Sequence, residues 1–255
     1  MSSFTIDALA VRVFDDDDAM GRAAAADAAE AIAGAVERTG AANVMLATGN
    51  SQFAFLAALL QRDDVPWAAI TAFHMDEYVG LGPEHPASFQ RYMRERVAAH
   101  VSVHAFHYLH GDAADPEAEA ARYASLLTAH PLDLCCLGIG ENGHLAFNDP
   151  GVADFDDPLD VKIVELDDAC RRQQVGEGHF AGVADVPTRA ITVTIPALLR
   201  ARRVLAIVPE ARKAAPVRGA LEGPITTACP ASVLRRQPRA TLYLDHASAG
   251  LLAVR

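Results

Sequence analysis

The sequence predicts an α/β fold with one doubly wound, mainly parallel sheet and helices on both of its faces. Short apolar segments of strand length alternate with longer segments in which apolar residues recur at helical spacing. Most of the short segments are apolar throughout, which is typical of parallel strands buried on both faces. The chain has 255 residues, 51% of them hydrophobic, which is enough for one sizeable core. We therefore predict a single domain over residues 1–255.

The first predicted element is a helix over residues 19–38. The acidic run 15–18 precedes it, and aspartate side chains accept hydrogen bonds from the free N–H groups at a helix start. Gly40 follows the helix and suits a left-handed helix end. The apolar run 43–47 comes next and is too short for a helix, so it is predicted as a strand.

The same alternation continues toward the C-terminus. Further strands are predicted at four apolar runs, over residues 69–73, 132–137, 203–208 and 240–244. Further helices are predicted over residues 53–60, 86–97, 116–129 and 211–221. No linker, internal repeat or low-complexity segment interrupts the pattern, which favours one sheet over two separate domains.

The composition excludes several classes of function. The chain carries 33 acidic and 22 basic residues, a formal net charge of −11, and has no block of lysine or arginine. Nucleic acids and anionic membranes require a basic surface, so neither is expected as a partner. No signal peptide and no apolar run of membrane-spanning length is present, and we expect a cytoplasmic location. The cysteines lack C-x-x-C spacing and are expected to be reduced: Cys135, Cys136, Cys170 and Cys229.

Three polar loops directly follow predicted strands, and ligands of an open parallel sheet bind beyond the carboxyl ends of its strands. The first of these loops consists of Thr48, Gly49, Asn50 and Ser51. Its glycine lets the backbone approach a ligand, and the helix that follows directs N–H groups toward an anion. The loop is therefore a candidate phosphate site. A strand-to-helix turn capped by Thr48 or Ser51 is the alternative.

The second loop begins at His74 and contains two adjacent carboxylates, Asp76 and Glu77. One of them could abstract a proton from a bound ligand if a partly desolvated pocket raised its pKa. The alternative is that Asp76 caps a turn and Glu77 faces water.

The third loop, residues 138–150, contains glycines at positions 138, 140 and 143 that allow a tight turn and bring His144 over a ligand. Asp149 follows five residues later and could orient and activate the imidazole. No thiolate cluster is present, and we predict no metal site and no cofactor.

These segments resemble the glucosamine-6-phosphate deaminase family, within the larger group that includes 6-phosphogluconolactonase. The resemblance is carried by residues 46–51, 73–81, 85–89 and 138–150 and by the stretch around Lys213, in the family's order and at its spacing. It implies a cofactor-free conversion of glucosamine 6-phosphate to fructose 6-phosphate and ammonia. A sugar phosphate is thus the expected small-molecule partner.

The resemblance also implies a role for each matching residue. His144 would open the sugar ring, with Asp149 behind it to set its protonation. Asp76 would remove the proton at C2 and return it at C1. The loop 48–51 and Lys213 would bind the phosphate, and Glu77 and Gly143 would belong to the substrate-binding residues.

Three positions depart from the family pattern. Asn142 stands where the family often has an aspartate, so it can only orient His144 or the substrate. Asp149 is one methylene shorter than the usual glutamate. The arginine that the family places before an aromatic pair is missing, and Arg171 or Arg172, about one turn upstream, is the predicted replacement.

Residues 151–187 contain several acids and few large apolar residues, and we predict a mobile lid within this segment. We expect a monomer or a small homo-oligomer. Two other functions stay open: a phosphosugar hydrolase resembling 6-phosphogluconolactonase, in which His144 would activate water, and a non-catalytic sugar-phosphate sensor.

Overall fold

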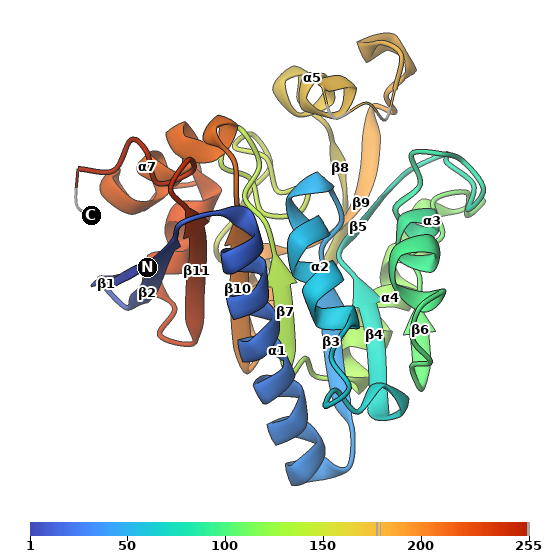
Figure 1. Cartoon of the computed structure of the whole chain (residues 1–255). Helices are drawn as coiled ribbons and strands as arrows, with labels where there is room; N and C mark the ends of the chain where they lie inside the picture. Colours follow the sequence, from blue (N-terminus) through green and yellow to red (C-terminus); the bar gives the residue numbers. More distant parts are fainter. Residues whose placement is uncertain (177, 179, 254–255) are drawn as a thin grey trace.

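An eight-stranded sheet forms the centre of the computed structural model, which describes residues 1–176, 178 and 180–253 (Figure 1). The strand order is β1-β2-β11-β10-β7-β3-β4-β6, and all neighbours are parallel except β1 and β2. The strands are β1 (Ser2–Ile6), β2 (Leu9–Phe14), β3 (Ala42–Leu46), β4 (Ile70–His74), β6 (Ala105–His107), β7 (Leu134–Leu137), β10 (Arg203–Val208) and β11 (Ala240–Asp245). The predicted α/β fold with a mainly parallel sheet is confirmed.

Helices cover both faces of this sheet. The α-helices of the described residues are α1 (Asp17–Thr39), α2 (Phe53–Leu60), α3 (Phe89–Met93), α4 (Pro116–Ala129), α5 (Asp168–Gly176), α6 (Ile195–Leu199) and α7 (Ala214–Glu222), and all but α5 lie beside the sheet. Cys136 of the central strand β7 packs in one core with residues of α1 and α2, whereas Cys135 packs in the other core with residues of α4, α6 and α7. Consecutive strand residues face opposite layers, so continuous apolar strands supply both cores.

The predicted helix boundaries agree closely with the structure at both ends of α1. The Asp16 side chain accepts a hydrogen bond from Ala19 N at 2.7 Å, and Gly40 has a φ of 82° at the helix end. The helix predicted over residues 86–97 is divided into α3 and a π-helical turn over Arg94–Ala98. No helix within the described ranges combines the length and the apolar composition needed to cross a bilayer.

A second, smaller sheet was not predicted. It is antiparallel and consists of β5 (Asp76–Tyr78), β9 (Arg189–Val193) and β8 (Val161–Glu165). Residues 76–78, predicted as part of a polar loop, are therefore a strand, and only Met75 separates it from the end of β4. An aromatic cluster of Tyr78, Phe89 and Phe147 supports this sheet, with ring centroids 5.0 to 5.7 Å apart.

The segment 151–187 contains β8, α5 and their connections. In Figure 1, α5 stands beyond the carboxyl ends of the main strands, above β8 and β9. Residues 177 and 179 of this segment lie outside the described residues. Val164 of β8 and Cys170 of α5 are buried in the core that contains the aromatic cluster. That the segment moves as a lid stays a prediction.

The order of the strands fixes where a ligand site can form. From β3 the chain continues to β4 on one side, and from β7 it continues to β10 on the other side. Strands β3 and β7 are neighbours, so the topological switch point lies between their carboxyl ends. The loops that follow these two strands, 48–51 and 138–150, are thereby brought next to each other.

Candidate active site

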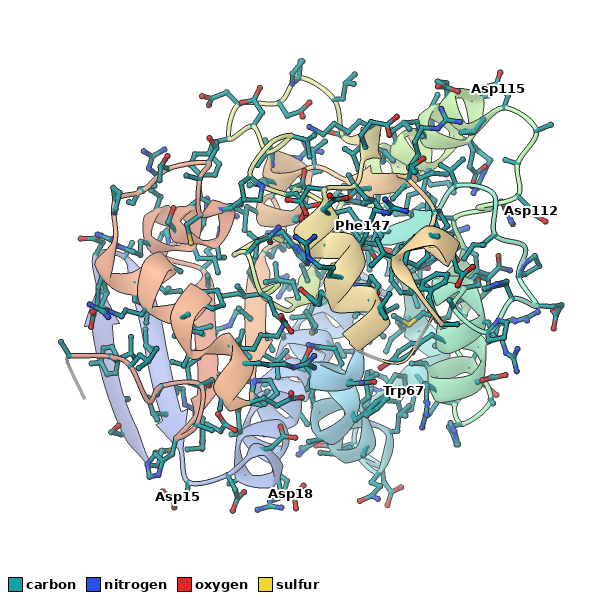
Figure 2. All side chains as sticks on the ribbon, turned by 90° about the horizontal axis from the view of Figure 1, so that it is seen from above. Asp15, Asp18, Trp67, Asp112, Asp115 and Phe147 are labelled. Carbon is teal, nitrogen blue, oxygen red and sulfur yellow. The ribbon has the colours of Figure 1, made fainter. Side chains whose placement is uncertain are left out.

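A pocket lies at this switch point and is lined by residues from the ends of β3, β4, β7 and β10, from β5 and from α5. The lining residues are Ala47, Thr48, Gly49, Ser51, Met75, Asp76, Phe89, Gly138, Ile139, Gly140, His144, Ala146, Phe147, Gln173, Gln174 and Lys213. Figure 2, seen from above, places Phe147 near the centre of the molecule beside α5, whereas Asp15, Asp18, Asp112 and Asp115 lie at its rim. The structure thus brings the three predicted loops together.

Asp76 places a buried carboxylate at this pocket. Its side chain is on β5, and its Oδ1 atom has no hydrogen-bond partner among the described residues. Burial, with a contribution from the adjacent charge of Glu77, raises the pKa of Asp76 well above its ordinary value. The nearby His74 adds no positive charge, because burial lowers its pKa to about 3. Asp76 therefore combines a high proton affinity with an open position toward a ligand.

Glu77 points away from the pocket, as expected for the next residue along a strand. Its carboxylate accepts hydrogen bonds from Tyr78 N, Ser88 Oγ, Phe89 N and Gln90 N at 2.8 to 3.2 Å. Burial raises its pKa to about 7, although these four donors act in the opposite direction. Glu77 thus anchors the start of α3, and the structure does not place it among the lining residues.

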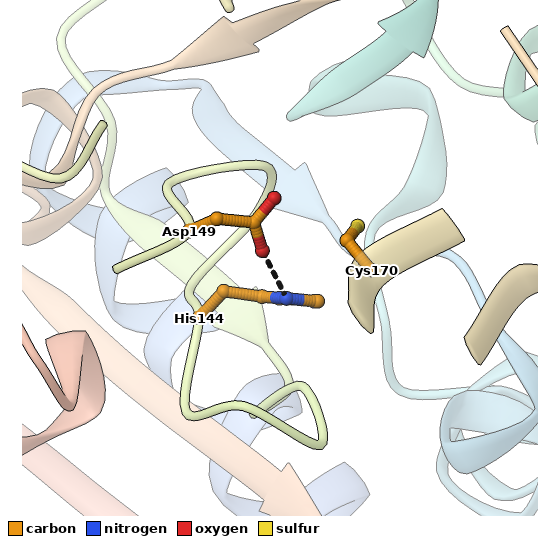
Figure 3. Close-up of side chains that lie close together, drawn as sticks. All are labelled: His144, Asp149 and Cys170. Carbon is orange, nitrogen blue, oxygen red and sulfur yellow. Dashed lines mark ion pairs between the residues drawn. The ribbon is translucent and has the colours of Figure 1, made fainter. Parts of the chain in front are cut away.

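His144 and Asp149 form a close pair, with 2.8 Å between Nδ1 and Oδ1 (Figure 3). Asn142 fixes both partners: its Nδ2 donates to Asp149 Oδ1 at 2.9 Å, and its Oδ1 accepts from His144 N at 3.1 Å. Burial would raise the pKa of Asp149, but the hydrogen bond and charge of His144, with Asn142 and Cys170, outweigh it and hold the pKa below its ordinary value. An ionised Asp149 can therefore orient the imidazole toward the pocket.

Two glycines make this position of the imidazole possible. A Cβ atom on Gly140 would lie 2.1 Å from His144 Nε2, so the ring occupies the space that any side chain at position 140 would need. Gly143 has a φ of 87°, a left-handed conformation that favours glycine, and its N–H donates to Gly140 O at 3.0 Å. The tight turn predicted for this loop is present, although Gly143 itself does not line the pocket.

The opposite wall is suited to an anion. Thr48, Gly49 and Ser51 line it directly before α2, whereas Asn50 does not. Gln52 ties this loop to β10, because its Nε2 donates to Ser51 Oγ and to Ile207 O. Lys213 also lines the pocket, on a 3₁₀ turn after β10, and its side chain is buried. A buried ammonium beside a helix start is an arrangement that binds phosphate.

Helix α5 contributes two glutamines that the sequence analysis missed. Gln173 Oε1 accepts from Glu141 N at 2.9 Å, whereas Gln174 Oε1 has no partner among the described residues although its side chain is only 5% exposed. The sequence gives little indication of their place in the pocket, because two glutamines after two arginines are typical of an exposed polar helix face.

The two arginines that precede these glutamines do not line the pocket. A guanidinium nitrogen of Arg171 donates to Val183 O at 2.6 Å and to Val186 O at 3.0 Å. Arg172 is exposed and lines a separate hollow beside Glu141 and Asn142. That either arginine contacts the substrate stays a prediction.

The structure also brings together three side chains of metal-binding type that the sequence spacing did not connect. A ring nitrogen of His144, a carboxylate oxygen of Asp149 and the sulfur of Cys170 lie within 4.8 Å of one another, and all three residues are buried (Figure 3). Cys170 is on α5, whereas the other two belong to the loop after β7. Imidazole, carboxylate and thiolate are all ligands of zinc-type ions.

Residues 15–243 match the family described as glucosamine-6-phosphate isomerases/6-phosphogluconolactonase. The chain belongs to this family. It is 39% identical over 210 residues to a glucosamine-6-phosphate deaminase of Exiguobacterium sp. strain AT1b, covering 82% of this chain and 80% of the relative. It is 37% identical over 215 residues to the protein of the same name from Listeria welshimeri, covering 84% and 89%.

Solved structures of family members have the same fold. A structure described as a monomeric glucosamine-6-phosphate deaminase superposes with a TM-score of 0.86 and 30% identity, covering 95% of this chain and 99% of that one. A 6-phosphogluconolactonase from Shewanella baltica superposes with a TM-score of 0.75 and 20% identity, covering 95% and 97%. The second likeness concerns the fold alone.

Proposed function

We propose that this family member is a glucosamine-6-phosphate deaminase, which converts glucosamine 6-phosphate and water to fructose 6-phosphate and ammonia. The observation that carries the proposal is that Asp76, the His144–Asp149 pair and Lys213 meet at one pocket. A base for a carbon-bound proton, an acid/base for a ring oxygen and a cation for a phosphate are the three groups that this reaction needs. The names of the relatives at 37–39% identity support the same function.

Phosphate binding would fix the substrate first. The ammonium of Lys213 and the backbone N–H groups of the loop 48–51 hold the phosphate oxygens at the start of α2. The unpartnered Gln174 Oε1 lies on another wall and accepts a hydrogen bond from a hydroxyl or amino group of the sugar. Binding at both ends leaves the reacting carbons between Asp76 and His144.

Ring opening follows at His144. The imidazole takes the proton of the C1 hydroxyl and delivers a proton to the ring oxygen, which yields the open-chain aldehyde. Asp149 keeps the ring oriented through the 2.8 Å contact with Nδ1, so Nε2 faces the substrate. Asn142, an amide, holds both groups in place and takes no proton.

Asp76 then moves a proton between carbons. Its carboxylate removes the proton from C2 while the C1 oxygen takes a proton from the ammonium group of the substrate, which leaves an enolamine. The carboxyl group then returns its proton to C1, which gives the protonated imine of fructose 6-phosphate. Water hydrolyses the imine and releases ammonia. The raised pKa of Asp76 suits this role, because a carboxylate with higher proton affinity is a stronger base toward a C–H group.

The test is to incubate the protein with glucosamine 6-phosphate in deuterated water and to measure ammonia, ketose phosphate and deuterium in the product. We expect equal amounts of ammonia and fructose 6-phosphate, with deuterium at C1. The variant Asp76→Asn should lose about 10³-fold or more of this rate, since the amide cannot accept the proton. Ammonia release that survives in Asp76→Asn would disprove the assigned base.

The same experiment addresses the 6-phosphogluconolactonase alternative. A lactonase moves no carbon-bound proton, so Asp76→Asn would retain hydrolysis of a phosphosugar lactone and the wild type would release no ammonia. A non-catalytic sensor would bind the sugar phosphate and leave it unchanged.

The remaining expectations accompany this proposal. We expect the enzyme to act in the cytoplasm without a resident cofactor, as a monomer or small homo-oligomer, and with the segment 151–187 closing over the bound sugar. Since α5 contributes Gln173 and Gln174 to the pocket, a movement of this segment would open and close one wall of the site.

A further inference from the structure

We propose that His144, Asp149 and Cys170 form a binding site for a divalent ion of the zinc type, and that this ion inhibits the enzyme. The binding part of this inference stands on the structure alone. The inhibition part rests on the proposed function, because it assumes that the His144–Asp149 pair takes part in turnover.

The geometry of the three donor atoms supports the site. A nitrogen, an oxygen and a sulfur atom lie within 4.8 Å of one another, all on buried side chains. Zinc-type ions bind such ligands at about 2.0 to 2.3 Å, so atoms that share one ion lie roughly 3 to 4 Å apart. His144 Nδ1 and Asp149 Oδ1 are already 2.8 Å apart, and a shift of about 1 Å at Cys170 would complete the set.

The electrostatics of the pocket favour a cation at this place. A carboxylate oxygen of Asp149 lies within 4.8 Å of the Cys170 sulfur, and the carboxylate of Asp167 adds a second negative charge beside this residue. Asp167 is held close by its contact with Cys170 N at 2.6 Å. A divalent ion would compensate these charges, and on binding it would replace the thiol proton, which is released to solvent.

The ion would block the chemistry for a simple reason. A nitrogen of His144 and an oxygen of Asp149 that bind a metal can no longer exchange a proton, so the imidazole cannot act at the ring oxygen. Cys170 would in addition tie α5 to the loop after β7. The soft sulfur donor selects zinc-type ions over magnesium or calcium, which prefer oxygen ligands.

The binding test uses the full-length protein freed of metal by dialysis against a chelator. Zn²⁺ is added and its stoichiometry is measured by equilibrium dialysis; Co²⁺ is added to a second sample, and the sulfur-to-cobalt absorption band reports a thiolate ligand. We expect one ion per chain and a clear band. In Cys170→Ser we expect no band and an affinity for Zn²⁺ reduced about tenfold or more.

Cys229→Ser is the matched control, because Cys229 is the more accessible thiol and belongs to the other side of the loop, against Gly143. This variant should keep both the band and the affinity. A band that is lost in Cys229→Ser and kept in Cys170→Ser would overturn the assignment, as would a wild type without a band. If Cys170→Ser does not fold, Cys170→Ala takes its place.

Enzyme activity is measured on the same samples. Zn²⁺ should stop ammonia release from glucosamine 6-phosphate in the wild type and in Cys229→Ser, the chelator should restore it, and Cys170→Ser should need at least about tenfold more Zn²⁺. If the wild type binds Zn²⁺ but its metal-free form does not convert glucosamine 6-phosphate, the proposed function is contradicted and the assignment of the metal site still holds. Turnover that Zn²⁺ leaves unaffected, despite binding, would overturn the inhibition.

Discussion

Gly140 lies directly against the imidazole of His144. The space of a Cβ atom at position 140 is taken by His144 Nε2, 2.1 Å from where that atom would stand. Gly140 N also donates to His144 O at 3.0 Å, so the backbone that carries the histidine is fixed by the residue on which its ring packs. The glycine therefore determines the position of the ring.

From this contact we predict the effect of Gly140→Ala. The methyl group displaces the imidazole by about 1 Å or more, and a misplacement of that size lowers turnover by about 100-fold. Deaminase activity and thermal unfolding are measured in parallel. Gly151→Ala is the control, because a Cβ atom there meets nothing within 4 Å. Full activity in Gly140→Ala would show that the ring position is not critical.

Asp76→Asn should stabilise the fold while it abolishes turnover. The pKa of Asp76 is raised in the folded protein above its ordinary 3.8, so the folded state binds the proton more tightly than the unfolded state. The stability gained from this tighter proton binding is complete below the pKa of Asp76 in the unfolded state. It is lost as the pH rises through the pKa of Asp76 in the folded state. The asparagine does not titrate, and the variant should gain about 1 kcal/mol over the wild type near pH 8.

The measurement for this prediction is urea unfolding at about pH 5 and about pH 8. The stability difference between Asp76→Asn and wild type should be larger at the higher pH. Asp63→Asn, at an exposed turn, should show no such trend. If Asp76→Asn is less stable than the wild type at both pH values, the expectation that the buried, ionised carboxylate lowers the free energy of unfolding is contradicted.

Lys213→Met should weaken substrate binding more than it slows the chemical step. The side chain is buried at the anion wall, and losing a charge-assisted contact to phosphate costs about 1.5 to 3 kcal/mol, or about 10- to 100-fold in KM. Steady-state kinetics separate KM from kcat, and the inhibition constant of inorganic phosphate gives an independent value. Arg218→Met, at an exposed position of α7, is the control. An unchanged phosphate affinity in Lys213→Met would place the phosphate elsewhere.

Gln173→Leu and Gln174→Leu should change stability in opposite directions. Gln174 carries a buried oxygen without a partner among the described residues, so its removal should stabilise the ligand-free protein by about 1 kcal/mol. Gln173 Oε1 accepts from Glu141 N, and losing that contact should destabilise the protein by a similar amount. The Tm values test this contrast. If Gln174 also binds the sugar, its variant should raise KM about tenfold.

Much of the main sheet follows from local patterns in the sequence. Buried parallel strands such as β10 are continuous apolar runs, and α1 has both an N-cap and a glycine end, so their boundaries are readable. The hairpin of β1 and β2 was missed although its residues alternate between polar and apolar, because its turn is made by Asp7 with a φ of 52° and not by the usual glycine.

The candidate site was predictable where the chain itself brings residues together. His144, Asn142 and Asp149 belong to one short loop, and their contacts follow from its glycines. The small sheet and α5 were not predictable, since β5 pairs with residues of β9 that are more than a hundred positions away, and β8 pairs with β9 across the whole of α5. The proximity of Cys170 to Asp149 and the burial of Gln174 depend on that long-range pairing, which no local spacing reveals.

The aromatic contact between Tyr78 and Phe147 links the segments that carry Asp76 and His144. Tyr78 is two residues from Asp76 on the same strand, Phe147 is three residues from His144 in the same loop, and their ring centroids are 5.2 Å apart. The tilted ring pair thus works as a spacer that sets how far Asp76 stands from the imidazole. A saturation library scored by product formation would therefore find these two positions nearly as intolerant as the reacting residues, with no role in proton transfer.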